Sequence, residues 1–400
     1  MNKTISKCRL CDSSNINLVW DFGITPIANA YKDKEDLNKE ELQFPLRYFK
    51  CSECHSLQVA DEIPSEVLFN DYLYEAPINL VPHFKEMVKT TIDYLGLPSE
   101  CKVIDIGSNN GLLLEEYKNV GCRVIGFEPC DRIAQKARDR GIDTFSQFFN
   151  CATSEQFTLQ YSSPELITCT NCFAHVSDLN DFVEALTIIM GKDTYFVFEN
   201  AYLVNTLLNK DFGQAYFEHF YLHSLSPLEK LFKKHGLELF NVTFNNIQMG
   251  SFRGFVRRIN NQSIVNNGSV QINIENEISN GLQNVSTYTK FINDINEAKI
   301  ALIDELEYIK NQNKSISVYA WPAKMTLLNK YLGLEKYFDY IIEESSVKIG
   351  KFAPGTELEL LSLEHFKNNP TDYCFIGAYN FADDIKRKNE WYKGVWIQPI

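Results

Sequence analysis

Three side chains that can move protons fall within four residues of the stretch GQAYFEHFYLHSL, Gly213 to Leu225. Tyr216, Glu218 and His219 supply a phenol, a carboxylate and an imidazole, and His223 follows four residues later. An imidazole titrates near neutral pH, which suits it to general acid–base chemistry. The cluster is therefore either a polar face of an ordinary helix or acid–base machinery directed at a substrate.

Two pairs of cysteines near the N-terminus predict a metal site at Cys8, Cys11, Cys51 and Cys54. Four thiolates in two Cys-x2-Cys motifs favour tetrahedral zinc, and they leave no open position for a substrate. The 39 residues between the pairs exceed the usual spacing of roughly 15–20, but closing a longer loop costs little extra entropy. We expect this zinc to stabilise the fold; the alternative is four buried, unpaired cysteines.

The stretch VIDIGSNNGLLLEE, residues 103–116, has the composition of a strand, a glycine turn and a helix. Gly107 and Gly111 permit a tight turn and a close approach of backbone to ligand. The turn does not match the G-x-G-x-x-G motif of dinucleotide enzymes, since it reads G-S-N-N-G. Asp105 at the strand end suits the ammonium of S-adenosylmethionine, and Glu128 after the next strand suits the ribose hydroxyls. The motif predicts S-adenosylmethionine; the alternative is a strand–turn–helix without a ligand.

Other residues expected at this cofactor follow the same strands. Ser108 and Asn109 belong to the glycine turn, and Pro129 follows Glu128. QFFN at 147–150 comes after the third strand, where Phe148 or Phe149 could pack on an adenine or belong to the core. Asn171 follows the fourth strand, near the expected position of the transferred methyl group.

Strand-like and helix-like segments alternate from about residue 79 onward and predict an α/β protein. The predicted domains are a zinc-binding domain at 1–78, a Rossmann-like domain for S-adenosylmethionine at 79–260 and a smaller α/β domain at 261–400. The last of these opens with a polar segment and one long helix over residues 279–312.

The composition limits what the chain can bind. Its net charge of −13 argues against general binding of nucleic acid. There is no apolar run of about 18 residues for a membrane span and no apolar signal-peptide core. Eleven cysteines, an odd number, favour a reduced, cytoplasmic protein. We expect a monomer or a small homo-oligomer with a small-molecule substrate.

A series of motifs along the chain resembles the zinc-containing C-methyltransferases that act on nucleotide-linked keto-deoxysugars. The motifs are, in order, CRLC…CSEC, FNDYLY, DIGSNNG with GFEP, NCFAHV, YFEHF with HSL, GSFRGFV, PAKMTLLN, KIGKFAPGT and AYNFADDI. The resemblance covers nearly the whole chain. It departs at Met249-Gly250-Ser251, where the family has Gly-Gly-Ser, and at Val318-Tyr319-Ala320-Trp321, where the family is richer in glycine.

The resemblance implies a reaction and the residues that perform it. A 4-keto group acidifies the hydrogen on carbon 3, a base removes it, and the enolate attacks the methyl group of S-adenosylmethionine. His219 is the expected base and His175 the alternative, while His223 is expected to be structural. Tyr216 could donate to the enolate oxygen, Glu218 could orient an imidazole or hold a hydroxyl, and Tyr72 or Tyr74 is expected to face the sugar.

The same resemblance implies a site for a nucleotide sugar linked through dTDP or a similar nucleotide. The residues expected at the diphosphate or the sugar are Ser251, Arg253, Lys324, Lys348, Lys351 and Asn380. The rival activity is O- or N-methylation of a nucleotide sugar or another small metabolite with the same cofactor. A zinc-binding scaffold without activity is a third possibility, which the intact cofactor motif disfavours.

Overall fold

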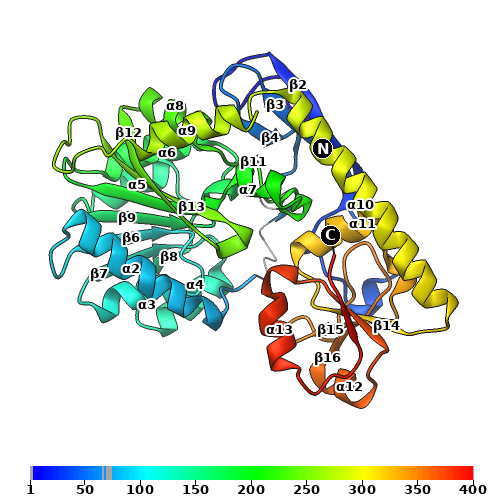
Figure 1. The fold of residues 1–400 in the computed structure, drawn as a ribbon. Coiled ribbons are helices and arrows are strands. Elements are labelled where there is room, and N and C mark those ends of the chain that lie inside the picture. The colour runs from blue at the N-terminus through cyan, green and yellow to red at the C-terminus, as the bar shows by residue number, and fades with distance from the viewer. Residues whose placement is uncertain (1–2, 65–66, 69–73, 400) are drawn as a thin grey trace.

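The computed structural model describes residues 3–64, 67–68 and 74–399 and has three sheet-based parts (Figure 1). The first part is a four-stranded antiparallel sheet in the order β11-β4-β3-β2, with a small β1–β5 ladder beside it. Its N-terminal elements are β1 (Lys3–Thr4), β2 (Ile16–Pro26), η1 (Lys34–Asp36), β3 (Gln43–Cys51), β4 (Leu57–Val59) and β5 (Asp61–Glu62). Its fourth strand, β11 (Tyr221–Leu222), comes from much later in the chain.

The second part is a seven-stranded sheet in the order β12-β13-β10-β9-β6-β7-β8. Strands β6 to β10 are parallel, and β13 and β12 continue the sheet in antiparallel fashion. The strands are β6 (Lys102–Ile106), β7 (Arg123–Phe127), β8 (Asp143–Phe145), β9 (Leu166–Thr170), β10 (Tyr195–Ala201), β12 (Leu237–Asn245) and β13 (Ser251–Arg258). The chain runs outward from β6 to β8 and then crosses back to β9, beside β6. A crevice is expected at the carboxyl ends of strands where the order reverses in this way.

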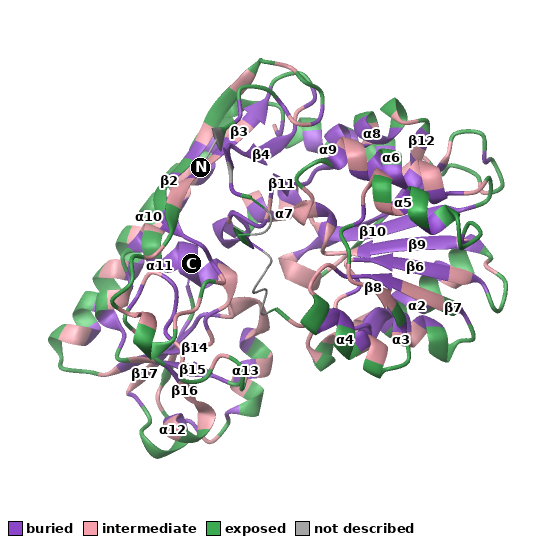
Figure 2. Ribbon diagram, turned by 180° about the vertical axis from the view of Figure 1, so that it is seen from behind, coloured by how far each residue is buried: buried purple, intermediate pink, exposed green. Residues whose placement is uncertain are grey.

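Helices cover both faces of this sheet, so its central strands β6, β9, β10 and β13 are almost wholly buried (Figure 2). They are α2 (Val81–Leu95), α3 (Leu112–Asn119), α4 (Asp131–Asp139), α5 (Cys151–Thr158), α6 (Leu179–Ile189), α7 (Leu203–Leu208), α8 (Leu225–Lys234) and α9 (Ser269–Ser279). Short 3-10 turns lie between them: η2 (Ile78–Leu80), η3 (Phe173–His175), η4 (Phe212–Gln214) and η5 (Ile247–Met249). The predicted parallel sheet with helices on both faces is confirmed.

The third part is a five-stranded parallel sheet in the order β16-β15-β14-β17-β18. Its strands are β14 (Ile316–Tyr319), β15 (Tyr340–Glu343), β16 (Leu360–Ser362), β17 (Tyr373–Ile376) and β18 (Val395–Ile397). The helical elements around it are α11 (Ala323–Leu332), η6 (Glu335–Tyr337), α12 (Leu363–Asn368), η7 (Tyr379–Phe381) and α13 (Ala382–Lys388). This is the smaller α/β unit expected from the sequence.

Helix α10 (Val285–Asn311) connects the parts and runs diagonally from the first sheet to the third (Figure 1). Its 27 residues span about 40 Å. The prediction that this helix begins near residue 279 was wrong, because Gly281 takes a left-handed φ of 75° and separates α9 from α10. Trp20 of β2 stacks on Phe291 of α10 with ring centroids 4.9 Å apart. The helix thereby ties the cysteine-bearing sheet to the C-terminal unit.

Candidate functional site

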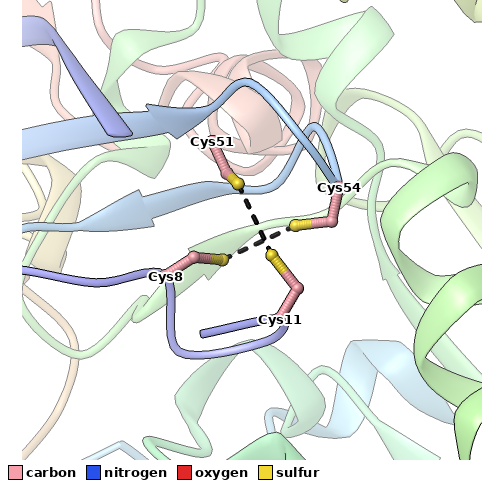
Figure 3. A group of neighbouring side chains, drawn as sticks. All are labelled: Cys8, Cys11, Cys51 and Cys54. Carbon is pink, nitrogen blue, oxygen red and sulfur yellow. Dashed lines mark hydrogen bonds between the residues drawn. The ribbon is translucent and has the colours of Figure 1, made fainter. Parts of the chain in front are cut away.

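Four cysteines form a compact cluster at one end of the first sheet (Figure 3). The Sγ atoms of Cys8 and Cys54 lie 3.5 Å apart, those of Cys11 and Cys51 lie 3.6 Å apart, and all four lie within 4.8 Å of one another. A tetrahedral zinc with Zn–S bonds of about 2.3 Å would set neighbouring sulfurs about 3.8 Å apart. The cluster therefore has the dimensions of a four-thiolate zinc site, as predicted.

Polar groups around the cluster suit a negatively charged metal centre. The side-chain amide of Gln58 donates to Cys8 Sγ at 3.1 Å, and the backbone N–H of Glu53 donates to Cys51 Sγ at 3.4 Å. Lys50 lies beside Cys51 and Cys54, and its side chain is held by the carbonyl of His55 at 2.7 Å. Such outer contacts orient metal ligands and offset the charge of the thiolates.

A cavity of about 430 Å³ opens at the carboxyl ends of β6, β7 and β9, at the expected crevice. Nine of the ten residues predicted to hold S-adenosylmethionine line it: Asp105, Gly107, Ser108, Asn109, Glu128, Pro129, Phe148, Phe149 and Asn171. Gly111 does not line the cavity. A Cβ there would lie 2.8 Å from Ile142 and 3.0 Å from Ala137, so this glycine permits close packing of α3 on α4.

The two acidic residues of the cavity differ in their surroundings. Glu128 accepts hydrogen bonds from the backbone N–H groups of Asn109 and Cys130, at 3.0 and 2.9 Å. Asp105 accepts from the Thr168 hydroxyl at 2.7 Å, and burial raises the pKa of its carboxyl to about 7. A ligand cation beside Asp105 would favour its ionised form and remove this cost of burial. The position thus fits the ammonium of S-adenosylmethionine.

Two histidines meet at the edge of this cavity. His175 lines the cavity from η3, directly after β9, and its ring centroid lies 4.8 Å from that of His219. Burial lowers the pKa of His175 well below its ordinary value and that of His219 to about 4, so both rings are neutral at pH 7. Two residues 44 positions apart in the chain thus form one group at the end of the cofactor cavity.

Hydrogen bonds select the tautomer of His219. Its Nδ1 lies 2.7 Å from the carbonyl oxygen of Gln214, which only accepts, so Nδ1 carries the proton. Nε2 is then an acceptor and lies 2.8 Å from the Tyr216 hydroxyl, which donates to it. The arrangement links the phenol to a neutral imidazole that is ready to receive a proton.

Glu218 points away from both imidazoles. Its Oε1 accepts from the side-chain amide of Asn29 at 2.9 Å, and its Oε2 has no hydrogen-bond partner among the described residues. Burial raises the pKa of this carboxyl to about 7. His223 stacks on Phe173 with ring centroids 5.3 Å apart, and its structural role stays a prediction. Tyr74 lines the cavity, whereas Tyr72 lies outside the described residues.

The three lysines expected at the diphosphate differ in their hydrogen-bond and ion-pair partners. Lys324 is 8% exposed, its Nζ lies 4.2 Å from the centre of the Tyr379 ring, and no described residue forms a hydrogen bond with it. Lys348 donates to the Tyr31 hydroxyl at 3.0 Å, and Lys351 pairs with Asp33 at 2.6 Å.

Two other residues expected to bind the substrate lie on the methyltransferase sheet, where their side chains form hydrogen bonds to protein groups. Each of the three guanidinium nitrogens of Arg253 donates a hydrogen bond, to Glu199, Thr90 and Glu86. The hydroxyl of Ser251 donates to the carbonyl of Ile247 at 2.8 Å. Asn380 lies in η7, beside Tyr379.

Several residues around Tyr216 and His219 were not predicted from the sequence. Asn29 and Tyr48 contact the 216–219 segment although they precede it by more than 160 positions in the chain. Asp211 accepts hydrogen bonds from Tyr379 and Gln214. Phe84 and Cys172 also line the cavity. These contacts arise only from the tertiary packing of the three parts.

Comparisons with known proteins agree with this geometry. Three family models match successive segments: "Putative zinc binding domain" at residues 8–69, "Methyltransferase domain" at 82–242 and "C-methyltransferase C-terminal domain" at 246–400. The chain is 28% identical over 405 residues to the C-methyltransferase NovU of Streptomyces niveus, an alignment that covers 100% of this chain and 96% of that protein.

Solved structures match part of the chain. Magnesium protoporphyrin IX methyltransferase from Synechocystis PCC 6803 with bound SAM is 12% identical, with a TM-score of 0.37, and the match covers 49% of this chain and 98% of that one. The mitomycin 7-O-methyltransferase MmcR is 15% identical, with a TM-score of 0.36, over 45% of this chain and 54% of that one.

The fold and the site define a methyltransferase that depends on S-adenosylmethionine and carries a zinc-binding domain. Within that class, the chain is similar to C-methyltransferases over its whole length, because the three family models match it in succession and it aligns with NovU over 405 residues. No helix in the described part of the chain is long and apolar enough to cross a membrane.

Proposed function

We propose that this protein methylates a carbon of a nucleotide-linked 4-keto-deoxysugar, at the carbon 3 position beside the ketone. The observation that carries the proposal is the group of His175, His219 and Tyr216 at the edge of the cofactor cavity. Carbon has to lose a proton before it can attack a methyl group, and neutral imidazoles suit that task.

The Tyr216–His219 pair is the proposed base. The phenol already donates to Nε2, so it can pass its proton to the imidazole while its oxygen takes the proton of the sugar. The Gln214 carbonyl keeps the other proton on Nδ1 and stabilises the imidazolium that forms. His175 lies beside the same pair and remains the alternative base.

S-adenosylmethionine, when bound, supplies an electrophilic methyl group. Asp105 and Glu128 would hold its ammonium and its ribose, and Phe148, which is exposed in the cavity wall, would pack on the adenine. Exclusion of water by the apolar cavity wall and alignment of the reacting atoms then supply most of the rate.

The diphosphate is proposed to bind at Lys324 and Lys348 of the C-terminal unit. The buried ammonium of Lys324 has no hydrogen-bond partner among the described residues, and an anionic ligand would offset the resulting desolvation cost. We leave Arg253 out of this set because protein carboxylates already engage its guanidinium.

Incubation of the purified protein with methyl-labelled S-adenosylmethionine and a panel of nucleotide-linked 4-ketosugars tests the proposal. The expected product carries the label on carbon, and deuterium at the acidic carbon should exchange with solvent even without a methyl donor. His219→Gln should slow exchange by about 10²- to 10⁴-fold without weakening cofactor binding. A label on oxygen or nitrogen, or exchange that continues unchanged in His219→Gln, would overturn the proposal.

A further inference from the structure

The segment that bears the proposed base is built onto the zinc-bearing sheet. Strand β11 pairs with β4, with Tyr221 opposite Gln58 and Leu222 opposite Leu57. The N–H of Val59 also donates to the carbonyl of Phe220 at 2.9 Å. The chain thus leaves the methyltransferase sheet after α7 and completes the first sheet directly after His219.

The phenol of Tyr48 holds both ends of the turn that contains the base. It lies on β3, an inner strand of this sheet, and its hydroxyl oxygen lies 3.2 Å from the carbonyl oxygen of Tyr216 and 3.0 Å from that of His219. Its single proton is shared between two acceptors. The side chain has no exposed surface, and burial raises the pKa of the phenol, so it remains a donor at all working pH values.

The turn is what brings phenol and imidazole together. On an extended strand, residues three apart point to opposite faces. Here the N–H of His219 donates to the carbonyl of Tyr216 at 2.9 Å, which closes the turn, and the two side chains meet at 2.8 Å. Without Tyr48, the partly buried carbonyl of His219 would lose this donor, at a cost of up to about 3 kcal/mol.

We propose that Tyr48 is a positioning residue for His219, through which the zinc-bearing sheet fixes the orientation and tautomer of the proposed base. The structural part of this inference stands on the contacts alone; its catalytic consequence rests on the proposed function. The titratable and charged groups that face His219 are Tyr216, His175, His223 and Lys324, and Tyr48→Phe removes none of them.

The test is Tyr48→Phe, which keeps the ring and removes only the hydroxyl. Long-range proton–nitrogen NMR reports the tautomer and the titration of His219, assigned with His219→Gln. The wild type should show a single tautomer protonated at Nδ1 and a pKa of about 4. In Tyr48→Phe the two tautomers should mix, because the carbonyl of Gln214 no longer meets Nδ1 in one fixed geometry. Zinc content should stay unchanged.

Tyr288→Phe is the matched control. Tyr288 is equally buried and packs on the same Trp20, but its hydroxyl donates to Leu282. It should leave His219 as in the wild type. An unchanged His219 in Tyr48→Phe, or an equal change in both variants, would overturn the inference.

Turnover separates this inference from the proposed function. With a ketosugar that gives product, Tyr48→Phe should lower kcat about 10- to 100-fold with little change in KM. A changed His219 signal with normal turnover would support the positioning and refute His219 as the base. An unchanged signal with an inactive His219→Gln would refute the positioning and retain the base.

Discussion

At the scale of single residues, the proposed catalytic segment, residues 216–219, consists of neighbours with different contacts. His219 and Tyr216 face each other, whereas Glu218 between them points to Asn29 of the zinc-bearing part. The three residues are close in sequence, but the carboxylate of Glu218 does not contact the other two side chains as one acid–base unit would. Side chains that follow one another in sequence diverge, and only the turn brings residues 216 and 219 together.

Glu218 makes stability depend on pH in a way that can be isolated. Burial raises the pKa of the Glu218 carboxyl to about 7, from about 4.5 in the unfolded chain. The contribution of the neutral carboxyl to the free energy of unfolding is therefore fully present below pH 4.5 and is lost as the pH rises through 7. Glu218→Gln keeps an acceptor for Asn29 and does not titrate. The variant should gain up to about 3 kcal/mol relative to the wild type between pH 4.5 and 8.

Urea unfolding at several pH values measures this difference. Glu115→Gln is the control, since Glu115 forms an exposed pair with Arg140. Equal pH dependence in Glu218→Gln and the wild type would show that the carboxyl is not held in the described environment.

At the scale of elements, local patterns in the sequence predicted most of the site but not its assembly. The cysteine pairs, the glycine turn after β6 and the order of strands and helices follow from residue types over short windows. The pairing of β11 with β4 does not, because a two-residue strand has no periodicity of its own. Helix α9 was also missed; its Glu277 accepts from the N–H groups of Leu225 and Ser226 at the start of α8, a long-range cap without a local motif.

Removal of the zinc should therefore impair methyl transfer more than cofactor binding. The cofactor cavity stands on the methyltransferase sheet, whereas the base segment depends on β3 and β4, which the cysteines hold. Cys11→Ser should lose zinc and lower turnover about tenfold or more, with the affinity for S-adenosylmethionine changed less than about threefold.

Elemental analysis, calorimetry with S-adenosylmethionine and turnover give the three quantities for Cys11→Ser. Cys151→Ser is the control: Cys151 lies on α5 and is not one of the four clustered cysteines, so this variant should keep its zinc. Full turnover in a zinc-free protein would refute the prediction that the zinc site supports the segment bearing the proposed base.

At the scale of the whole molecule, the three parts meet around the proposed catalytic segment, residues 216–219. The methyltransferase sheet supplies the cofactor cavity and His175, and the zinc-bearing sheet supplies Asn29 and Tyr48. The C-terminal unit supplies Tyr379, which donates to Asp211 just before the segment. Helix α10 fixes the first and third parts relative to each other, so the charged groups of the C-terminal unit are held at the site without belonging to the cofactor cavity.

This arrangement predicts that mutations can weaken the binding of the nucleotide sugar without weakening the binding of S-adenosylmethionine. Lys324 lies at the start of α11, in the C-terminal unit, and is absent from the wall of the cofactor cavity. Hydrogen bonds from a charged donor contribute about 1.5–3 kcal/mol, so Lys324→Met should raise KM for the nucleotide sugar about 10- to 100-fold. The affinity for S-adenosylmethionine should not change, because no described contact of Lys324 reaches that ligand's residues.

Lys351→Met is the matched control, since Lys351 pairs with Asp33 near the surface and should have little effect. Initial rates over a range of both substrates decide the matter: parallel losses for both ligands would mean that Lys324 supports the whole interface rather than an anion, and an unchanged KM would move the diphosphate elsewhere.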